Sequence, residues 1–587
     1  MSHIFKQPTS PNRSVAVELR LKGKPRPGVS PLKVMVLMAL MVGVLCGEAG
    51  AVSDFFHDGV SFQVRDLLTT GTPPLSLGGR FLALKLHPAL APFYTERRDA
   101  AVWIHGQKLS REAERLIRYL RSLSDEGLCP EDYRLAELEE LLGVHRGAEM
   151  SGGYIPAELL ATLDVLLSDA FLCLADDLIA GRVDPRRVHE NWRFPKVTQD
   201  ASRLLRFALS ENAVIDVLEQ LKPSSPSYRR LVAALARYRD IAARGGWPRI
   251  PDGAVVRPGD SDPRMPLLVV RLAISGDLAA GEEITFGALD APLRRALIRF
   301  QERHGLEGDG VLGAKTLQAL NVTVDERIRQ IEVNLERLRW LPKNLGLKYL
   351  VVNIPDMMLT VMEEDHPVLW MPVVVGRALR ETPVFSARMT YLVFSPFWHV
   401  PATIFREDKL PKIRKDAKYL EKNHFEIIPW SKGEDGEEVL DPRSIDWNVV
   451  EADSFPAVMR QHPGPWNPLG QVKFMFPNPD SIYLHDTNEP WLFSRNQRLF
   501  SSGCIRIQRP LDLAQYLLEE EGWSCEKLLN ATALFHPHTV LLPEPLPVYL
   551  LYQTAWAARD GSVQFRNDLY FKDMMLDYLL GLRNRRR

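Results

Sequence analysis

Apolar residues recur every three to four positions through the first 250 residues, which is the spacing of helices that bury one face. One such stretch runs from Ser110, a helix-capping residue, to about residue 124, with Gly127 just beyond it. A longer stretch runs from about residue 156 to 180 and is followed by Gly181. These patterns predict a helical domain over residues 52–250 whose role is structural.

The next part of the chain is predicted to contain a linker and a small helical unit. Residues 251–283 begin with many Pro, Gly and Asp residues, which indicates a linker. Residues 284–341 then show two short helical patterns around the turn Asp309-Gly310. We expect a second, small helical domain there.

From residue 346 the apolar spacing changes to every second residue, which is typical of β-strands. Residues 346–555 are therefore predicted to form a mostly-β domain, with residues 556–587 as a C-terminal segment. Residues 402–465 interrupt the strand pattern with charged and aromatic residues. They form either a solvated loop or a lid, and we expect a lid. The chain as a whole is predicted to be a multidomain α+β protein.

The N-terminus has the pattern of a secretory signal peptide. Residues 1–33 carry seven Lys or Arg residues and one acid, and an apolar run of 13 residues covers 34–46. Ala49 and Ala51 fit a cleavage site, so the mature chain is expected to start at Val52 in the periplasm. A bilayer-spanning helix needs about 20 residues. An uncleaved membrane anchor is the alternative.

Composition excludes several classes of protein. The formal net charge of −1 over 587 residues gives no reason to expect a nucleic-acid partner. Four cysteines outside the signal segment are too few for a disulfide framework. Cys129 and Cys173 lie in helical patterns and are expected to be buried, with pairing between them left open. Cys504 is expected to be a free thiol.

The strongest chemical signal is a histidine followed 19 residues later by a cysteine in a turn of small residues. His485 ends a strand pattern, and Cys504 follows Ser502 and Gly503, with Arg506 two residues beyond. A thiol is mostly protonated at neutral pH, and a nearby imidazole can take its proton. The residues alone leave two alternatives: Cys504 as a nucleophile with His485 as its base, chemistry that needs no metal or cofactor, or a buried cysteine and an unrelated histidine.

These motifs resemble the active-site signature of the L,D-transpeptidases, the cysteine enzymes with a YkuD-type catalytic domain that cross-link bacterial peptidoglycan. The strings Tyr483-Leu484-His485-Asp486-Thr487 and Ser502-Gly503-Cys504-Ile505-Arg506 carry the resemblance. Phe397-Trp398-His399-Val400-Pro401 also matches the catalytic domain. Residues 127–133 and 181–185 resemble the scaffold domain of the large periplasmic branch, and residues 300–321 resemble its peptidoglycan-binding domain, which implies a three-helix unit over residues 284–341. The large members carry a capping subdomain where residues 402–465 stand.

The resemblance implies roles for individual residues. Cys504 would be the nucleophile and His485 the base, with the backbone carbonyl of Ser502 orienting the imidazole. Gly503 permits a backbone geometry that brings N–H groups toward a substrate oxyanion. Arg506 would hold an anionic part of the substrate or shape the pocket, and Tyr483 would line the donor groove. Trp398 is assigned to substrate binding, although core packing explains it equally well; the roles of Asn467, Gly470 and Lys473 stay open.

The implied partners are peptidoglycan stem peptides. The donor would be a tetrapeptide that loses D-Ala, and the acceptor amine of a second stem would complete a 3→3 cross-link. Water or a protein lysine could serve as acceptor instead. Carbapenem-type β-lactams would be covalent inhibitors, and we expect a monomer.

Two other classes are weighed. A papain-type peptidase would place its cysteine before its histidine, and here the order is reversed. A non-catalytic wall-binding protein would have no need of the Cys, His and Arg set.

Overall fold

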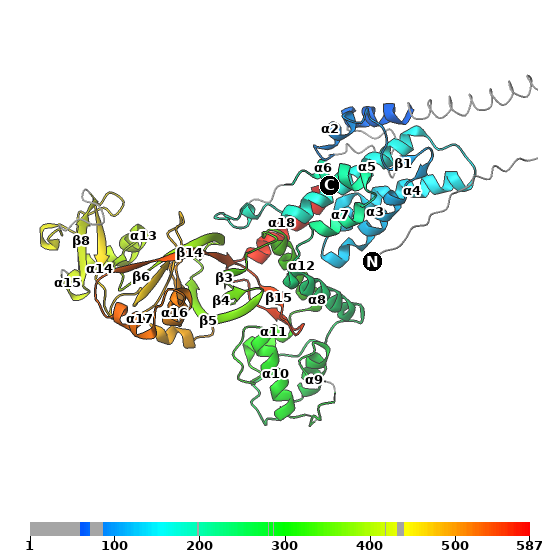
Figure 1. The fold of residues 1–587 in the computed structure, drawn as a ribbon. Helices are drawn as coiled ribbons and strands as arrows, with labels where there is room; N and C mark the ends of the chain where they lie inside the picture. The colour runs from blue at the N-terminus through cyan, green and yellow to red at the C-terminus, as the bar shows by residue number, and fades with distance from the viewer. Residues whose placement is uncertain are drawn as a thin grey trace, which may run out of the picture.

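The computed structural model describes residues 59–70, 86–195, 199–279, 281–285, 287–416, 418–430 and 439–586, with side chains up to residue 581. The expected signal peptide, residues 1–51, lies outside these ranges. Figure 1 shows a group of N-terminal helices, a β-sheet domain and a small helical unit joined through central helices. None of the described helices is long and apolar enough to cross a membrane.

The N-terminal helices pack around one buried helix, α5 (Ala157–Ala180). This helix ends at Gly181, whose φ of 80° lies in the region that favours glycine. Nineteen of its 24 residues are buried, so it is the centre of the domain and not a surface helix with one apolar stripe. The surrounding elements are residues 59–70, α2 (Leu90–Thr95), α3 (Arg111–Ser122), α4 (Leu135–Met150), α6 (Ala201–Ser210), α7 (Val214–Leu221) and the hairpin of β1 (Ile104–His105) and β2 (Lys108–Leu109).

Helix α3 confirms the capping signal read from the sequence. The Ser110 side chain accepts a hydrogen bond from the Ala113 N–H, which satisfies one of the free donors of the first turn. A short 3-10 turn follows α3 and ends at Gly127, with φ of 69°.

Two central helices join the domains. Helices α8 (Pro226–Ala243) and α12 (Val324–Arg339) share a core with the ribbon of β15 (Ala555–Ala557) and β16 (Val563–Phe565). The sequence analysis placed α12 in the small helical domain. Its apolar face packs on α8 instead, because a helical pattern shows that a face is buried without showing which element covers it.

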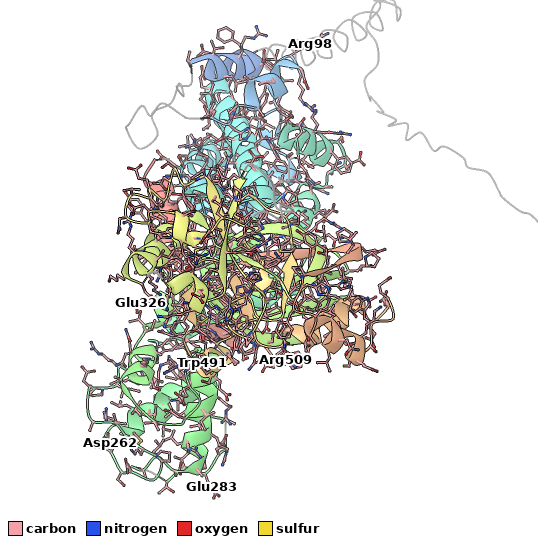
Figure 2. The ribbon with its side chains drawn as sticks, turned by 90° about the vertical axis from the view of Figure 1, so that its left-hand side faces the viewer. Arg98, Asp262, Glu283, Glu326, Trp491 and Arg509 are labelled. Carbon is pink, nitrogen blue, oxygen red and sulfur yellow. The ribbon has the colours of Figure 1, made fainter. Side chains whose placement is uncertain are left out.

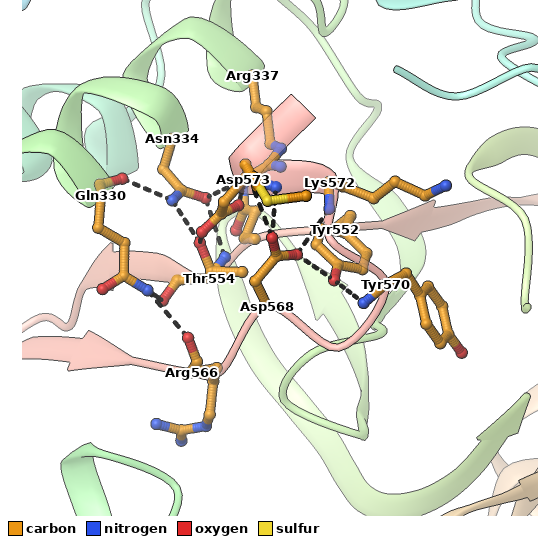
Figure 3. A network of polar contacts seen from close by, with 12 residues as sticks. Gln330, Asn334, Arg337, Tyr552, Thr554, Arg566, Asp568, Tyr570, Lys572 and Asp573 are labelled. Atoms are coloured by element: carbon orange, nitrogen blue, oxygen red, sulfur yellow. Dashed lines mark hydrogen bonds and ion pairs between the residues drawn. The ribbon is translucent and has the colours of Figure 1, made fainter. Parts of the chain in front are cut away.

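The C-terminal helix α18 (Lys572–Arg586) is fixed to this junction by a polar network (Figure 3). Asp568 accepts the backbone N–H groups of Lys572 and Asp573 and so satisfies donors at the start of the helix. Asp573 in turn accepts the Thr554 hydroxyl at 2.6 Å and pairs with Arg337 of α12. The C-terminal segment is therefore a structural part of the junction between the domains.

The small domain consists of α9 (Met265–Ile274), α10 (Ala291–Arg303) and α11 (Ala314–Leu320), which share one apolar core. The prediction of a linker over residues 251–283 is therefore wrong for its second half: α9 lies there, and its residues Met265, Leu268 and Leu272 are buried. Figure 2 shows the labelled Asp262 and Glu283 of this domain at the end of the molecule opposite Arg98 of the N-terminal helices.

The β-sheet domain is built on a nine-stranded sheet that curls on itself, because β4 pairs with β3 on one side and β5 on the other. The mostly-β prediction is confirmed. Helices α16 (Pro510–Leu518) and α17 (Cys525–Thr532) contribute to its core. In sheet order the strands are β12 (Leu499–Ser501), β5 (His366–Gly376), β13 (Ile505–Ile507), β11 (Leu484–His485), β10 (Val472–Met475), β6 (Phe385–Phe394), β14 (His538–Leu551), β3 (Lys348–Asn353) and β4 (Met358–Glu363).

We call residues 402–465 the cap. Its described residues, 402–416, 418–430 and 439–465, form a folded subdomain with its own apolar core, not a solvated loop. A three-stranded sheet, β7-β9-β8, ties the cap to the β-sheet domain. The buried Asn467 closes its base, because its side-chain N–H₂ donates to the carbonyls of Pro396 and His462 at 3.0 and 3.2 Å. The cap elements are α13 (Ala402–Ile404), a π-helical turn (Phe405–Lys409), α14 (Leu410–Lys415), α15 (Tyr419–Lys422), β8 (Phe425–Pro429) and β9 (Ala457–Gln461). Strand β7 (Trp398–His399) lies just before the cap and pairs with β9.

Candidate active site

Four side chains of the expected site, together with Lys473, lie on three neighbouring strands or, for Tyr483 and Cys504, directly before β11 and β13. His485 on β11 lies opposite Lys473 on β10 and beside Arg506 on β13. Directly paired residues project from the same face of a sheet, and so do residues two positions apart in one strand. Tyr483 and Cys504 precede His485 and Arg506 by two positions each, and the rings of Tyr483 and His485 lie 5.7 Å apart. Strand pairing thus gathers all five on one face.

The turn before Cys504 is held in an unusual backbone geometry. Gly503 has a φ of 116°, which a residue with a side chain rarely adopts. Its N–H donates to the Ser501 hydroxyl at 3.2 Å, and its carbonyl accepts the Thr382 hydroxyl at 2.8 Å. Among the described residues, the N–H of Cys504 has no hydrogen-bond partner.

Thr382 is itself anchored from the C-terminal segment. Its hydroxyl accepts the Gly376 N–H at 2.9 Å, while the Tyr570 hydroxyl donates to the Gly376 carbonyl at 2.6 Å. Thr382 and Tyr570 are both buried. A continuous set of hydrogen bonds therefore runs from the start of α18 to the turn that carries Cys504.

Burial governs the protonation of the thiol. It raises the pKa of Cys504 to about 11, although hydrogen bonds from Tyr483 and the charges of Arg506 and Lys473 act in the opposite direction. The sulfur also lies 3.7 Å from the Ser481 carbonyl, which the S–H can contact as a donor. The thiol of the free protein is therefore protonated at neutral pH.

The imidazole of His485 is neutral. Burial and then the charge of Arg506 lower its pKa to about 3, and hydrogen bonding to the carbonyls of Asp486 and Pro468 only partly offsets this. Nδ1 lies 2.5 Å from the Asp486 carbonyl. The sequence analysis gave this orienting role to Ser502. In the structure the carbonyl of Asp486 contacts the ring instead, because β11 ends at His485 and the next carbonyl turns toward the imidazole.

The side chain of Ser502 has a different partner. Its hydroxyl accepts a hydrogen bond from Arg380 Nη1 at 2.9 Å. The same nitrogen contacts Asp408 at 2.9 Å, and the other terminal nitrogen pairs with Glu407. Both carboxylates belong to the π-helical turn of the cap, so Arg380 connects the cap to the turn that carries the thiol.

With this geometry in place, similarity to known proteins identifies the domain. Residues 347–526 match the L,D-transpeptidase catalytic domain, YkuD. The chain is also 33% identical over 278 residues to a protein of Haemophilus influenzae named "Putative L,D-transpeptidase".

The chain carries an L,D-transpeptidase catalytic domain. The match to the Haemophilus protein covers 46% of this chain and 55% of that protein, so the chain spans about half the length of this curated relative. A solved L,D-transpeptidase of Xylanimonas cellulosilytica aligns at 15% identity over 51% of this chain and 99% of that one, with a TM-score of 0.17, which is too low to support a comparison of geometry.

The remaining domains also match known families. Residues 88–235 match a scaffold domain, and residues 262–320 match a domain described as "Putative peptidoglycan binding domain". The second match begins before α9 and ends at α11, in agreement with the three helices that share a core. The L,D-transpeptidase domain is thus one part of a multidomain chain.

Arg506 in the L,D-transpeptidase domain is paired within the protein. Its Nη1 lies 2.5 Å from the Glu489 carboxylate and 3.4 Å from the Thr487 hydroxyl. These contacts fix the guanidinium beside His485, which favours its role in shaping the pocket.

Tyr483 and Trp398 lie on opposite sides of the boundary between the site and the cap. Tyr483 contacts Cys504 and packs partly against the cap core. Trp398 is 8% exposed and belongs to that core, with the Lys409 ammonium 4.9 Å from its ring centre. The structure therefore supports core packing for Trp398 and not the substrate contact assigned from the sequence.

Gly470 provides room for a neighbour of the base. A Cβ at this position would lie 2.2 Å from Asp486 Oδ2, and the backbone φ is 58°. The same carboxylate accepts the Gln471 N–H at 2.8 Å. Gly470 thus lets the Asp486 side chain lie against strand β10 while the backbone carbonyl of Asp486 faces His485.

The cysteines of the described chain, Cys129, Cys173, Cys504 and Cys525, form no disulfide. Cys129 and Cys173 are only partly buried, so the expectation of full burial is wrong for both. Within the described residues there is no group of three or more His, Cys, Asp or Glu side chains able to hold a metal ion.

Sequence reasoning missed Arg380, Thr382 and Tyr570. Arg380 and Thr382 follow strand β5, which runs parallel to β12 just before the cysteine turn. Their contacts cross about 120 residues of sequence, and no local motif links the two segments. Gly376, which ends β5, was the available signal of a tight turn after that strand. A Cβ at this position would lie 2.2 Å from the Arg380 carbonyl, so the turn requires glycine.

Proposed function

We propose that this chain is a peptidoglycan L,D-transpeptidase that forms 3→3 cross-links through a thioester on Cys504. One observation carries the proposal: Cys504, His485, Tyr483 and Arg506 share one sheet face within a catalytic domain of this family. The chemistry needs a nucleophile, a base and an oxyanion donor, and the site has a residue for each.

In the first half-reaction, sulfur attacks the carbonyl carbon of the third residue of the donor stem. His485, which is neutral and can accept a proton, takes the proton from the thiol as the S–C bond forms. The N–H of Cys504 stabilises the oxyanion. The C–N bond to D-Ala then breaks, and its amine leaves with the proton held by His485.

In the second half-reaction, the side-chain amine of an acceptor stem attacks the thioester. The amine passes a proton to His485 as the new C–N bond forms. The C–S bond breaks, and the sulfur is protonated again by the imidazole. The cycle returns the neutral thiol and imidazole of the free protein without a cofactor.

Because the thiol and the imidazole are both neutral in the free protein, the thiol is activated only when a donor is bound. A thiol with a pKa of about 11 beside an imidazole with a pKa of about 3 does not form an ion pair at neutral pH. Proton transfer therefore accompanies attack on a bound donor. A low concentration of thiolate in the free protein limits reaction with other electrophiles.

The same function places the protein outside the cytoplasm, where its polymer substrate lies. We propose the periplasm, on the basis of the basic and apolar pattern of residues 1–51 and the match to a peptidoglycan-binding domain. Sequencing the mature N-terminus tests this: Val52 is expected, and an intact chain in washed membranes contradicts cleavage.

The activity is tested with the purified mature chain and disaccharide tetrapeptide as substrate. We expect dimers whose mass equals two substrates less one D-Ala, joined at the third residue of the donor. Cys504→Ala abolishes them, while Cys525→Ala, a change at an exposed cysteine, leaves them unaltered. Tripeptide as the only product identifies a carboxypeptidase. No turnover with retained binding to sacculi identifies a non-catalytic wall-binding protein.

A further inference from the structure

A groove of about 450 Å³ lies where the small helical domain meets the catalytic domain. This volume is within the range of about 300–1,000 Å³ that is common for ligand sites. Residues from four separate segments line it, around residues 304–306, 355–358, 496–498 and 556–569, including Gly305, Asn496, Gln497, Trp556, Gln564 and Asn567. It is separate from the residues proposed for the chemistry.

The groove is preformed, because its walls are joined by specific contacts. Arg566 pairs with Asp356 of the catalytic domain at 2.6 Å and donates to the Arg303 carbonyl of α10 at 3.0 Å. A Cβ on Gly305 would lie 2.6 Å from the Arg566 side chain, so glycine permits this close approach. The rings of His304 and Phe565 stack at 5.5 Å behind the groove.

The charged groups of the groove are already paired. Arg566 is neutralised by Asp356, and Arg498 donates to the carbonyls of Val373 and Met357 at 3.0 Å each. Burial and nearby arginines hold the pKa of His304 well below its usual value, so this residue is neutral. No charged side chain is left to select an anion such as a phosphate.

The groups that remain available are neutral. Asn496, Gln497 and Asn567 are exposed, and within the described residues their side-chain amides have no hydrogen-bond partner. Trp556 is partly exposed and pairs with Gln564 in the β15–β16 ribbon, and the Arg566 guanidinium lies over its ring, 4.9 Å from the ring centre. Amides both donate and accept, and an indole supplies a flat apolar face with one donor.

We propose that this groove binds the N-acetylated glycan strand of peptidoglycan, an inference that rests on the proposed function. Sugar hydroxyl and acetamido groups match free amides, and the apolar face of a pyranose ring matches the face of Trp556. A neutral polyhydroxylated ligand also fits a site whose charges are paired internally.

The groove is connected to the nucleophile by a short segment. Asn496 and Gln497 precede β12, which ends at Ser501, and Cys504 follows three residues later. Seven residues of extended chain span at most about 25 Å, so Gln497 and Cys504 lie within that distance of each other. A polymer that places its glycan in the groove and a stem peptide at Cys504 uses both sites at once and gains effective concentration.

Binding of a peptide-free glycan tests this inference. The probe is a tetramer of N-acetylglucosamine, titrated calorimetrically into the full mature chain. We expect Asn496→Ala/Gln497→Ala and Trp556→Ala each to weaken binding by tenfold or more. Trp370→Ala, which removes an exposed tryptophan outside the groove, is the matched control and leaves binding unchanged.

Acylation of Cys504 by a carbapenem is measured in parallel and is expected to be unchanged in all three variants. Absence of glycan binding by the wild-type chain, or binding that neither groove variant weakens, overturns the inference while leaving the proposed activity intact. If Trp556→Ala fails to fold, the surface double variant decides. If the wild-type chain is neither acylated by the carbapenem nor able to form dimers, the proposed function itself is contradicted.

Discussion

His485 and Arg506 lie side by side in the parallel pair of strands β11 and β13. After burial, the charge of Arg506 is the main cause that lowers the pKa of His485 to about 3. The same charge also favours the thiolate of Cys504. Arg506 therefore helps to keep the imidazole of His485 neutral, and it also stabilises the Cys504 thiolate that forms when His485 takes the proton.

Arg506→Gln is expected to move the titration midpoint of His485 upward, because the change removes a positive charge while keeping a donor for Glu489. NMR titration of the imidazole carbons measures the midpoint. Arg509→Gln, at a half-exposed arginine paired with Asp512, is the control and should leave the midpoint in place. An unchanged midpoint in Arg506→Gln would show that burial alone sets the protonation of His485.

The alkylation rate of Cys504 is expected to rise by about tenfold per pH unit between pH 6 and pH 9, because the reactive thiolate remains scarce below a pKa of about 11. The rate is measured with iodoacetamide on a variant in which Cys129, Cys173 and Cys525 are changed to Ala, so that only Cys504 reacts. A plateau below pH 8 would indicate a thiolate–imidazolium pair in the free protein and contradict the neutral pair.

Thr382→Val is expected to lower kcat by about 10- to 100-fold with little change in KM, because the carbonyl of Gly503 loses the donor that fixes the turn beside Cys504. The loss of a buried hydrogen bond should also lower the free energy of unfolding by about 1–3 kcal/mol. Thr382→Ser keeps the hydroxyl and should retain most activity. If Val and Ser variants turn over at equal rates, Thr382 has no positioning role.

Arg380→Gln is expected to loosen the cap, since it breaks the contacts that join Ser502 to Glu407 and Asp408. Hydrogen exchange of residues 402–465 should become faster, and turnover should fall more than thermal stability. Arg406→Gln removes a half-exposed arginine of the same turn that pairs with Asp453 and serves as the control. Equal exchange in the two variants would mean that Arg380 does not hold the cap.

Trp398→Ala is expected to destabilise the cap by about 3–5 kcal/mol, because it leaves a cavity in a packed core. Trp430→Ala, at a tryptophan 63% exposed on the same insertion, should have little effect. Thermal unfolding combined with limited proteolysis reports on this directly. If Trp398→Ala has normal stability but a raised KM, Trp398 contacts the substrate in the donor groove.

The sequence predicted those features whose signals are local. The His485 and Cys504 strings are short motifs, and α3 and α5 have clear periodicity with caps at Ser110 and Gly181. The partner of α12 was not predictable, because an amphipathic pattern does not name the surface that covers it.

The contacts around the cysteine turn required the fold. Thr382 reaches Gly503 only because β5 and β12 pair across 120 residues, and Tyr570 joins them from the last segment of the chain. Asp486 replaces Ser502 as the partner of His485 because of how the chain turns after β11. Such details depend on strand pairing and local backbone direction, which no spacing of residues specifies.

The acyl-enzyme is the most direct test of the whole account. The mature chain is incubated with tetrapeptide donor in the absence of an acceptor amine, and intact mass is followed by peptide mapping. The account predicts one adduct with the mass of the donor less D-Ala, located on Cys504 and absent from Cys504→Ala. An adduct on another residue, or cross-linked dimers made by Cys504→Ala, would contradict it.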